Sequence, residues 1–376
     1  MQILSGIYLH IPFCKQACSY CDFYFSTSLA NKDVVIKSMV KEIEESQNYL
    51  PEKNIKSIYF GGGSPSLLSN VDLSLLFKSL SNYYTWDLET EITLEANPDD
   101  VTTEKLKVWK EAGINRLSIG LQSFNNEELK WMNRAHSAEE SLRSVKLAQE
   151  MGFHNITIDL IYGSKFQTLK SWDETLEIAI GLGTQHISAY NLTIEAKTVL
   201  GSGYYKGSEP SVDEELSKEL FDLMVNRLTE AGFVHYEISN FGKPGFLAKH
   251  NSNYWLQEAY LGLGPSAHSY NYESRQWNLR NNNLYVKALE QGDVYFEREE
   301  LALRDRYNEY VLTRLRTLWG CDLLEIEKKF GPELSDHFRA RAHSQKKLLD
   351  EKDGIYTLNH AGKFLADGIA SNFFFL

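Results

Sequence analysis

Three cysteines near the start of the sequence have the spacing to hold an inorganic centre. Cys14, Cys18 and Cys21 form C-x3-C-x2-C within CKQACSYCDF, and the chain of 376 residues contains four cysteines in all. Thiolates this close together on one loop can converge on one metal centre. The alternative is a set of buried structural thiols, but cysteines that only fill a core are seldom clustered in this way.

The number of thiols separates two kinds of metal centre. A structural zinc site takes four protein ligands, usually from paired C-x2-C knuckles. The sequence has no second knuckle, Cys321 lies far from the other three cysteines, and His10 is a possible fourth ligand. A [4Fe–4S] cluster held by three cysteines instead leaves one iron open to an exchangeable ligand. The pattern favours this cluster, and zinc remains the alternative.

The elements that position these residues alternate between short apolar runs and amphipathic stretches over the first two thirds of the chain. Six repeated β–α units predict an α/β fold, an incomplete (β/α)6 barrel with a parallel sheet and right-handed crossovers. The alternative is a doubly wound open sheet. We expect strands at 7–11, 55–60, 91–96, 116–122, 155–162 and 186–192. We expect helices near 32–49, 71–83, 102–112, 126–150, 171–182 and 213–231.

The places of the distinctive side chains favour the barrel. Cys14 follows the first predicted strand and GGGS (61–64) follows the second. Glu95 and Gln122 lie at the ends of the third and fourth, and Asp159 lies within the fifth. A barrel gathers its active site at the carboxyl ends of its strands, so residues far apart in the sequence would meet in one mouth.

The longer stretch YLHIPFCKQACSYCDF resembles the radical S-adenosylmethionine (SAM) family, in particular its coproporphyrinogen-dehydrogenase-like branch, whose motif reads Y-x-H-I-P-F-C-x3-C-x-[FY]-C. The resemblance covers nearly the whole chain. It implies that the three cysteines bind a [4Fe–4S] cluster and that the amino and carboxylate groups of SAM chelate its fourth iron. It also implies that an electron donor reduces the cluster, which can pass one electron to the sulfonium of SAM.

Further motifs match positions that contact SAM in this family. FGGGSPS (60–66) follows a predicted strand, and its glycines let the backbone approach a ligand closely. An arginine in MNRAHS suits a two-point grip on the SAM carboxylate. A tight turn, a helix cap, a core tyrosine or a surface arginine is the plainer explanation of each position. The positions that the resemblance assigns to SAM are Tyr8, Tyr20, Gly62, Gly63, Ser64, Glu95, Gln122, Arg134, Asp159 and Thr193.

A second motif points to haem. HNSNYW (250–255) resembles the H-N-x-x-Y-W block of the same branch, in which the histidine is the suggested haem ligand. Neutral imidazole is a good axial ligand for haem iron. The resemblance therefore implies that His250 binds haem, and we expect it near the barrel mouth that holds the cluster and SAM. The alternative is a hydrogen-bonded structural histidine in a packed loop.

Two features separate two branches of the family. The dehydrogenases carry a further cysteine two residues after the third, where this sequence has Phe23, and a long extension before the first strand, which we expect to be missing here. Both differences imply a haem chaperone that passes haem to an acceptor protein. The alternative is an oxygen-independent coproporphyrinogen III dehydrogenase, so enzymatic activity is left open. SKFQT (164–168) departs from the family's usual L-P-G-Q-T.

The pattern of the chain changes after residue 235. We expect a radical SAM partial barrel over 1–235 and a connecting segment over 236–300 that carries the HNxxYW motif. FGKPGFLAKHNSNYW (241–255) in this segment is predicted to be a loop because of its glycines and aromatic residues. A mainly helical, winged-helix-like domain is expected over 301–376, and Cys321 within it is predicted to be structural.

The balance of charge limits the partners. Lys and Arg number 39 against 51 Asp and Glu, a net charge of −12. This balance argues against nucleic-acid binding and against a polybasic membrane anchor. No apolar run approaches the length of a membrane-spanning helix, and the N-terminus lacks the features of a signal peptide. We therefore expect a cytoplasmic protein with no integral membrane segment.

Overall fold

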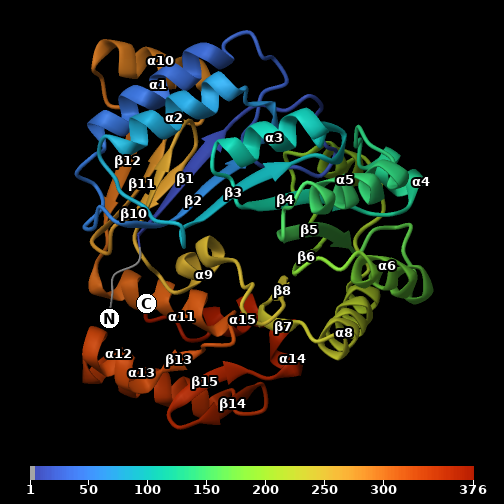
Figure 1. The fold of residues 1–376 in the computed structure, drawn as a ribbon. Helices are drawn as coiled ribbons and strands as arrows, with labels where there is room; N and C mark the ends of the chain where they lie inside the picture. Colours follow the sequence, from blue (N-terminus) through green and yellow to red (C-terminus); the bar gives the residue numbers. More distant parts are fainter. Residues whose placement is uncertain (1–4) are drawn as a thin grey trace.

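One large sheet forms the body of the molecule, whose residues 5–376 are described by a computed structural model (Figure 1). Among these residues the sheet has twelve strands, in the order β12-β11-β10-β9-β1-β2-β3-β4-β5-β6-β8-β7. The run from β9 through β1 to β6 is parallel. The strands beyond it at both edges are antiparallel. The strands are β1 (Ser5–Ile11), β2 (Ile55–Gly62), β3 (Glu91–Ala96), β4 (Arg116–Gln122), β5 (Asn155–Tyr162), β6 (His186–Asn191), β7 (Val234–Glu237), β8 (Asn240–Gly242), β9 (Tyr260–Leu263), β10 (His268–Tyr270), β11 (Ser274–Asn278) and β12 (Phe296–Glu300).

Helices alternate with the parallel strands, and the six predicted strands are confirmed. The predicted helix at 126–150 is wrong, because the structure has two helices there. Asn133 breaks it with a left-handed φ of 54°, and Ser137 caps the second helix. The helices of this part are α1 (Lys32–Glu45), α2 (Asn70–Ser81), α3 (Thr103–Glu111), α4 (Asn126–Trp131), α5 (Ala138–Glu150), α6 (Leu169–Gly181), α7 (Val199–Tyr205), α8 (Glu214–Glu230), α9 (Lys249–Trp255) and α10 (Asn282–Gln291), with 3-10 turns η1 (Pro65–Leu67) and η2 (Pro98–Asp100).

The segment over 236–300 contributes strands to both edges of the sheet. β8 pairs with β6, while β9 pairs with β1 and is followed by β10, β11 and β12. The predicted loop over 241–255 is wrong, because this stretch contains most of β8 and all of α9. Each of these elements needs partners that are distant in the sequence, as in the pairing of Gly6 with Tyr260. Local sequence patterns therefore do not predict these strands.

The two faces of the parallel sheet differ in chemistry, because successive side chains of a strand point to opposite faces. In β2, Ile58 and Phe60 are fully buried in a core that also takes residues from α1, α2, α3, α5, α6 and α8. Their neighbours Ser57 and Tyr59 contact a residue of α9, which lies on the other face (Figure 1). The β–α helices thus cover one face only, which confirms the partial barrel over the doubly wound alternative.

The C-terminal part has its own apolar core and, over residues 303–371, its own three-stranded sheet in the order β13-β15-β14. Cys321 is fully buried in this core. The part joins the large sheet through an ion pair between Arg275 and Glu309 (2.9 Å) and other contacts. Its elements are α11 (Leu303–Leu315), β13 (Cys321–Asp322), α12 (Leu323–Phe330), α13 (Pro332–Ser344), β14 (Leu349–Lys352), β15 (Ile355–Leu358), α14 (His360–Lys363) and α15 (Ala366–Ser371). Within residues 5–376 no helix combines the length and apolar character needed to cross a membrane.

A buried carboxyl group ties α1 to the strands beyond β1. Glu42 is fully buried and accepts hydrogen bonds from the Gly264 N–H (2.7 Å), the Asn278 amide and the Tyr285 hydroxyl. These three partners follow β9, end β11 and lie in α10. Burial raises the pKa of Glu42 to about 7, although the three hydrogen bonds act in the opposite direction.

A close backbone contact fixes the start of the cysteine loop. The Gly63 N–H donates to the Ile11 carbonyl (2.9 Å), and the Ser64 N–H donates to the Phe13 carbonyl (2.7 Å). A Cβ on Gly63 would lie 2.6 Å from the Phe13 oxygen and 2.7 Å from the Ile11 oxygen. The GGGS loop therefore packs directly against the backbone that leads into Cys14, and only glycine fits there.

We expect the stabilising effect of Glu42 to depend on pH. Its carboxyl keeps a proton up to about pH 7 in the folded chain but ionises near its ordinary pKa of 4.5 when unfolded. Its contribution to the free energy of unfolding is therefore full below pH 4.5 and falls as the pH rises to about 7. In urea unfolding, the difference between wild type and Glu42→Gln is expected to shrink over this window by up to about 3 kcal/mol. Glu45→Gln, at an exposed position of the same helix, is the control; a wild-type advantage over Glu42→Gln that stays constant with pH would contradict this account.

Gly63→Ala is expected to lower the free energy of unfolding by about 2–3 kcal/mol, because the added methyl group forces two backbones apart. Gly181→Ala is the matched control, since a Cβ on this residue of α6 would meet nothing within 4 Å. We expect the control to keep its stability or gain up to about 1 kcal/mol from helix propensity. Denaturant unfolding at neutral pH measures both variants, and equal stability would show that the contact at Gly63 is not tight.

Candidate functional site

The loop between β1 and α1 carries the three predicted metal ligands. Cys14, Cys18 and Cys21 are free thiols, and each is partly exposed. Among residues 5–376 no three histidine, cysteine or carboxylate side chains gather closely enough to hold a single metal ion. His10, the possible fourth zinc ligand, has both ring nitrogens hydrogen-bonded within the protein. This donor set fits a [4Fe–4S] cluster, in which the thiolates bind different irons, better than it fits zinc.

Neighbouring turns hold the cysteine loop in place. Lys15 forms an ion pair with the buried carboxylate of Asp100 (2.6 Å), which follows β3. Asn133 accepts a hydrogen bond from Gln16 (2.7 Å) and donates one to the Ala17 carbonyl (2.7 Å). The break between α4 and α5, which the sequence did not reveal, therefore serves to fix this loop.

A chain of hydrogen bonds joins the GGGS loop to the cysteine loop. Asn97 donates to Ser64 Oγ (2.8 Å) and accepts from Arg134 Nη2 (2.7 Å). Arg134 also donates through Nη2 to the Gly120 carbonyl (2.8 Å) and through Nη1 to Cys18 Sγ (3.3 Å). Its Nε is buried without a hydrogen-bonding partner in the described part of the chain. Because both Nη atoms are engaged, the predicted two-point grip on the SAM carboxylate is not preformed.

Two carboxyl groups lie inside the barrel near this end. Glu95 accepts hydrogen bonds from the Tyr59 hydroxyl (2.8 Å) and the Gly62 N–H (3.2 Å). Asp159 accepts one from Ser118 Oγ (3.1 Å). Burial raises the pKa of Glu95 to about 7 and that of Asp159 to about 6, and the charge of Asp159 adds to the shift of Glu95. The pair can therefore hold a proton near neutral pH.

Of the remaining predicted SAM positions, Tyr8 lies within β1, and the other three lie at or beyond the ends of strands. Gln122 ends β4 with a left-handed φ of 66°, and its amide nitrogen lies beside Arg134 Nη2 above Gly120. Tyr20 packs against a small apolar core at this end, and Thr193 is exposed two residues beyond β6. The structure thus gathers the mouth that the sequence predicted, while the assignment of its residues to SAM stays a prediction.

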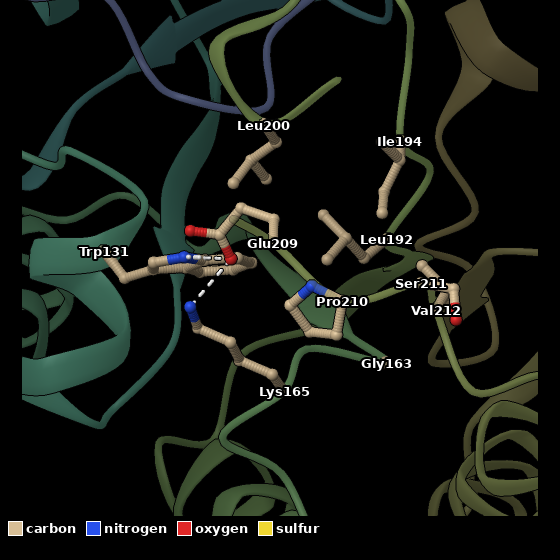
Figure 2. Close-up of a pocket in the computed structure, with 10 residues that line it drawn as sticks. All are labelled: Trp131, Gly163, Lys165, Leu192, Ile194, Leu200, Glu209, Pro210, Ser211 and Val212. Carbon is tan, nitrogen blue, oxygen red and sulfur yellow. Dashed lines mark hydrogen bonds and ion pairs between the residues drawn. The ribbon is translucent and has the colours of Figure 1, made fainter. Parts of the chain in front are cut away.

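A small, open pocket lies beside the cysteine loop, and its lining residues include Trp131, Lys165 and Glu209 (Figure 2). Lys165 and Glu209 form an ion pair across it (2.7 Å), and Trp131 Nε1 donates to the same carboxylate (3.2 Å). Leu200 of α7 provides part of the apolar wall, and its N–H donates to the Ser19 carbonyl (2.9 Å). The lysine belongs to SKFQT, so this departure from the family pattern shapes the rim of the mouth.

His250 lies at the opposite end of the strands. Its ring, in the first turn of α9, stacks on Tyr59 with centroids 5.1 Å apart and lies 6.3 Å from the ring of Tyr8. Nδ1 is hydrogen-bonded to Ser57 Oγ (2.9 Å) near the start of β2, and Nε2 has no hydrogen-bonding partner within residues 5–376. Burial lowers the pKa of His250 to about 4, so the ring is neutral at neutral pH. The expectation that this histidine lies in the mouth is wrong.

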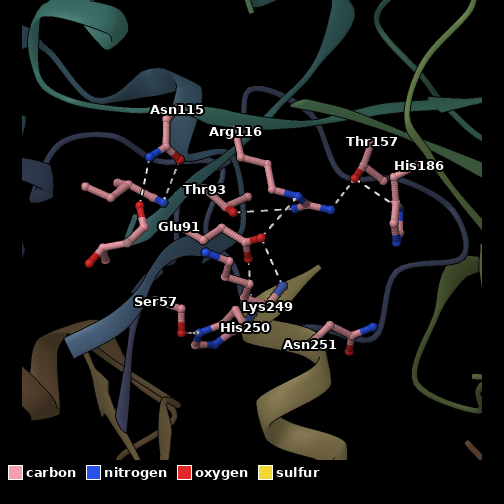
Figure 3. A network of polar contacts seen from close by, with 12 residues as sticks. Ser57, Glu91, Thr93, Asn115, Arg116, Thr157, His186, Lys249, His250 and Asn251 are labelled. Carbon is pink, nitrogen blue, oxygen red and sulfur yellow. Dashed lines mark hydrogen bonds and ion pairs between the residues drawn. The ribbon is translucent and has the colours of Figure 1, made fainter. Parts of the chain in front are cut away.

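A buried ion pair beneath α9 organises this end of the barrel (Figure 3). Glu91 begins β3 and Arg116 begins β4, with 3.8 Å between the carboxylate and Nε. Arg116 also donates to the Thr157 hydroxyl. Glu91 accepts hydrogen bonds from the N–H groups of Lys249 (2.9 Å) and His250 (3.0 Å). The side chains that pair inside the sheet therefore also fix the start of α9.

Comparison with known proteins places these features in a family. The model of the radical SAM superfamily matches residues 8–179, and that of the HemN C-terminal domain matches residues 301–365. The heme chaperone HemW of Bacillus subtilis (strain 168) is 33% identical over 377 residues, covering 98% of this chain and 99% of that protein. HemW of Lactococcus lactis subsp. lactis (strain IL1403) is 35% identical over 331 residues, covering 88% of this chain and 86% of that protein.

A solved structure shares the fold. Coproporphyrinogen III oxidase (HemN) from Escherichia coli superposes with a TM-score of 0.83, at 22% identity, over 99% of this chain and 90% of that chain. Likeness at this identity concerns the fold alone, whereas the relatives above are similar in sequence over nearly their whole length. The chain therefore belongs to the radical SAM superfamily and, within it, to the HemW family.

Proposed function

We propose that this protein is a haem chaperone that binds a [4Fe–4S] cluster, SAM and haem and delivers haem to an acceptor protein. The observation that carries the proposal is the state of His250 in the H-N-x-x-Y-W block. It is a neutral histidine whose Nε2 has no hydrogen-bonding partner within residues 5–376, at the other end of the barrel from three free thiols. The relatives that are named heme chaperones support the same function.

The cysteine end has the residues to hold the cluster and SAM. We assign Cys14, Cys18 and Cys21 to the cluster, which supplies one-electron chemistry when bound. Arg134 Nη1 donates a hydrogen bond to the Sγ atom of one of them, Cys18. The positions assigned to SAM are Tyr8, Tyr20, Gly62, Gly63, Ser64, Glu95, Gln122, Arg134, Asp159 and Thr193.

The contribution of the chain at the haem end is a neutral imidazole. One of its nitrogens, Nδ1, is already hydrogen-bonded to Ser57, which leaves Nε2 as the nitrogen available to iron. Histidine is a common axial ligand of haem iron. His250 in this state would be free to ligate haem iron through Nε2.

We further propose that the protein acts in the cytoplasm, where a reducing environment keeps the cluster thiols free. An electron donor would reduce the cluster, and a haem acceptor would receive the haem. The excess of Asp and Glu over Lys and Arg, 51 against 39, suits partners with basic surfaces.

An anaerobic haem titration of the cluster-reconstituted protein tests the proposal. We expect saturation near one haem per chain and a Soret band distinct from that of free haem. His250→Ala is expected to weaken haem binding at least about tenfold, because the axial ligand is lost. His268→Ala, an exposed histidine of β10, is the matched control and is expected to bind as the wild type does.

Two outcomes would overturn this function. Wild-type affinity in His250→Ala would show that another residue binds the iron. A protein that binds no haem specifically, but decarboxylates coproporphyrinogen III when supplied with SAM and a reductant, would be an oxygen-independent dehydrogenase instead.

A further inference from the structure

Side chains outside the H-N-x-x-Y-W block tie the block to the starts of the parallel strands. Both oxygens of Glu91 are used: Oε2 accepts the Lys249 N–H and Oε1 accepts the His250 N–H. The same carboxylate is paired with Arg116, which is anchored on β5 through Thr157. The backbone of His250 is therefore positioned by a carboxylate that cannot move without breaking a buried ion pair.

The second residue of the block is tied to the same network. Asn251 Nδ2 donates to the Tyr236 hydroxyl (3.2 Å), which is also hydrogen-bonded to His186 Nε2 (2.9 Å). His186 Nδ1 is in turn hydrogen-bonded to the Thr157 hydroxyl (3.1 Å), which also accepts a hydrogen bond from Arg116. Two consecutive residues of the block thus join the hydrogen-bonded network that contains the ion pair.

The imidazole ring itself is held from two sides. Ser57 is fully buried, and its hydroxyl is the hydrogen-bonding partner of His250 Nδ1. A Cβ on Gly6 would lie 2.9 Å from Ser57 Oγ and 3.3 Å from Nδ1, so a larger residue at position 6 would press on this hydrogen bond. Tyr59 covers one face of the ring. The two nitrogens therefore keep fixed places.

A neutral imidazole carries its one proton on either nitrogen, and iron binds only the nitrogen that keeps its lone pair. If iron takes Nε2 of His250, the proton must be on Nδ1. The Ser57 hydroxyl then accepts that proton in a hydrogen bond, which orients the ring and makes Nε2 a stronger donor to the metal.

We propose that Ser57 and Glu91 are positioning residues for haem. Ser57 holds the tautomer that offers Nε2 to iron, and Glu91 holds the backbone that carries the ring. Neither side chain touches the haem in this account; each acts through His250. The inference rests on the proposed function and deepens it.

The test compares two serines that differ in one contact. Ser57→Ala removes the acceptor for Nδ1, whereas Ser252→Ala removes a buried hydroxyl of α9 that has no hydrogen-bonding partner within residues 5–376. Full-length, cluster-reconstituted variants are titrated with haem, and the iron–histidine stretch of the ferrous complexes is recorded by resonance Raman spectroscopy. We expect Ser57→Ala to bind haem about tenfold more weakly and to shift the stretch to lower frequency. Ser252→Ala is expected to match the wild type in both.

Glu91→Gln tests the backbone contact. It is expected to weaken haem binding by about tenfold and to leave the stretching frequency unchanged, because the Ser57 hydrogen bond remains. If this variant fails to fold, as loss of a buried charge partner can cause, Ser57→Ala decides the inference alone. If Ser57→Ala keeps the wild-type haem affinity and iron–histidine stretching frequency while His250→Ala loses haem binding, only the positioning role is overturned. Wild-type binding in His250→Ala would instead overturn the proposed function.

Discussion

The ion pair between Arg116 and Glu91 is the interaction on which the inside of the barrel depends. Arg116 is 2% exposed and Glu91 is 5% exposed, and a charge buried to this degree is strongly destabilising unless an opposite charge lies beside it. Burial and then the positive charge of Arg116 lower the pKa values of His250 and His186. Burial, helped by the charge of Arg116, therefore keeps two histidines neutral, and Glu91 fixes the helix that carries one of them.

Both ends of the strands keep buried polar atoms without partners. At the starts of the strands, hydroxyl groups join ring nitrogens in a continuous network, but Arg116 Nε, Ser5 Oγ and Asn155 Oδ1 have no hydrogen-bonding partner in the described residues. At the ends, Glu95 and Asp159 carry raised pKa values, and Arg134 keeps a buried Nε without a partner in the described residues. A ligand with an ammonium group, hydroxyls and a carboxylate would satisfy these groups, and SAM has all three. The carboxyl ends of the strands are thus suited to such a ligand, while the network at their starts holds one histidine in place.

Much of this arrangement could be predicted from the sequence, because local signals specify it. The parallel strands have strong apolar runs. The glycines at 61–63 and the three cysteines indicate the loops that follow two of these strands. What could not be predicted depends on contacts between distant segments. β9 exists through its pairing with β1. Asn97 joins Ser64 to Arg134, although the sequence pattern assigned no role to this asparagine.

The place of the haem-ligand candidate was missed for a related reason. The H-N-x-x-Y-W block resembles a family motif, but a motif fixes residue types and not the end of the barrel where they lie. His250 lies at the starts of the strands because Glu91, the first residue of β3, caps α9 there. Nothing in the sequence indicated that the first residue of a strand, Glu91, would accept hydrogen bonds from the start of a helix 158 positions further along the chain.

One side chain connects the two ends of the strands. Ser57 lies beside His250 near the start of β2, and Ser64 lies beside the cysteine loop just after β2 ends. Tyr59 contacts both ends of the strands, because its ring stacks on His250 and its hydroxyl donates to Glu95. A change in the charge of Glu95 would therefore reach the face of the His250 ring through one side chain.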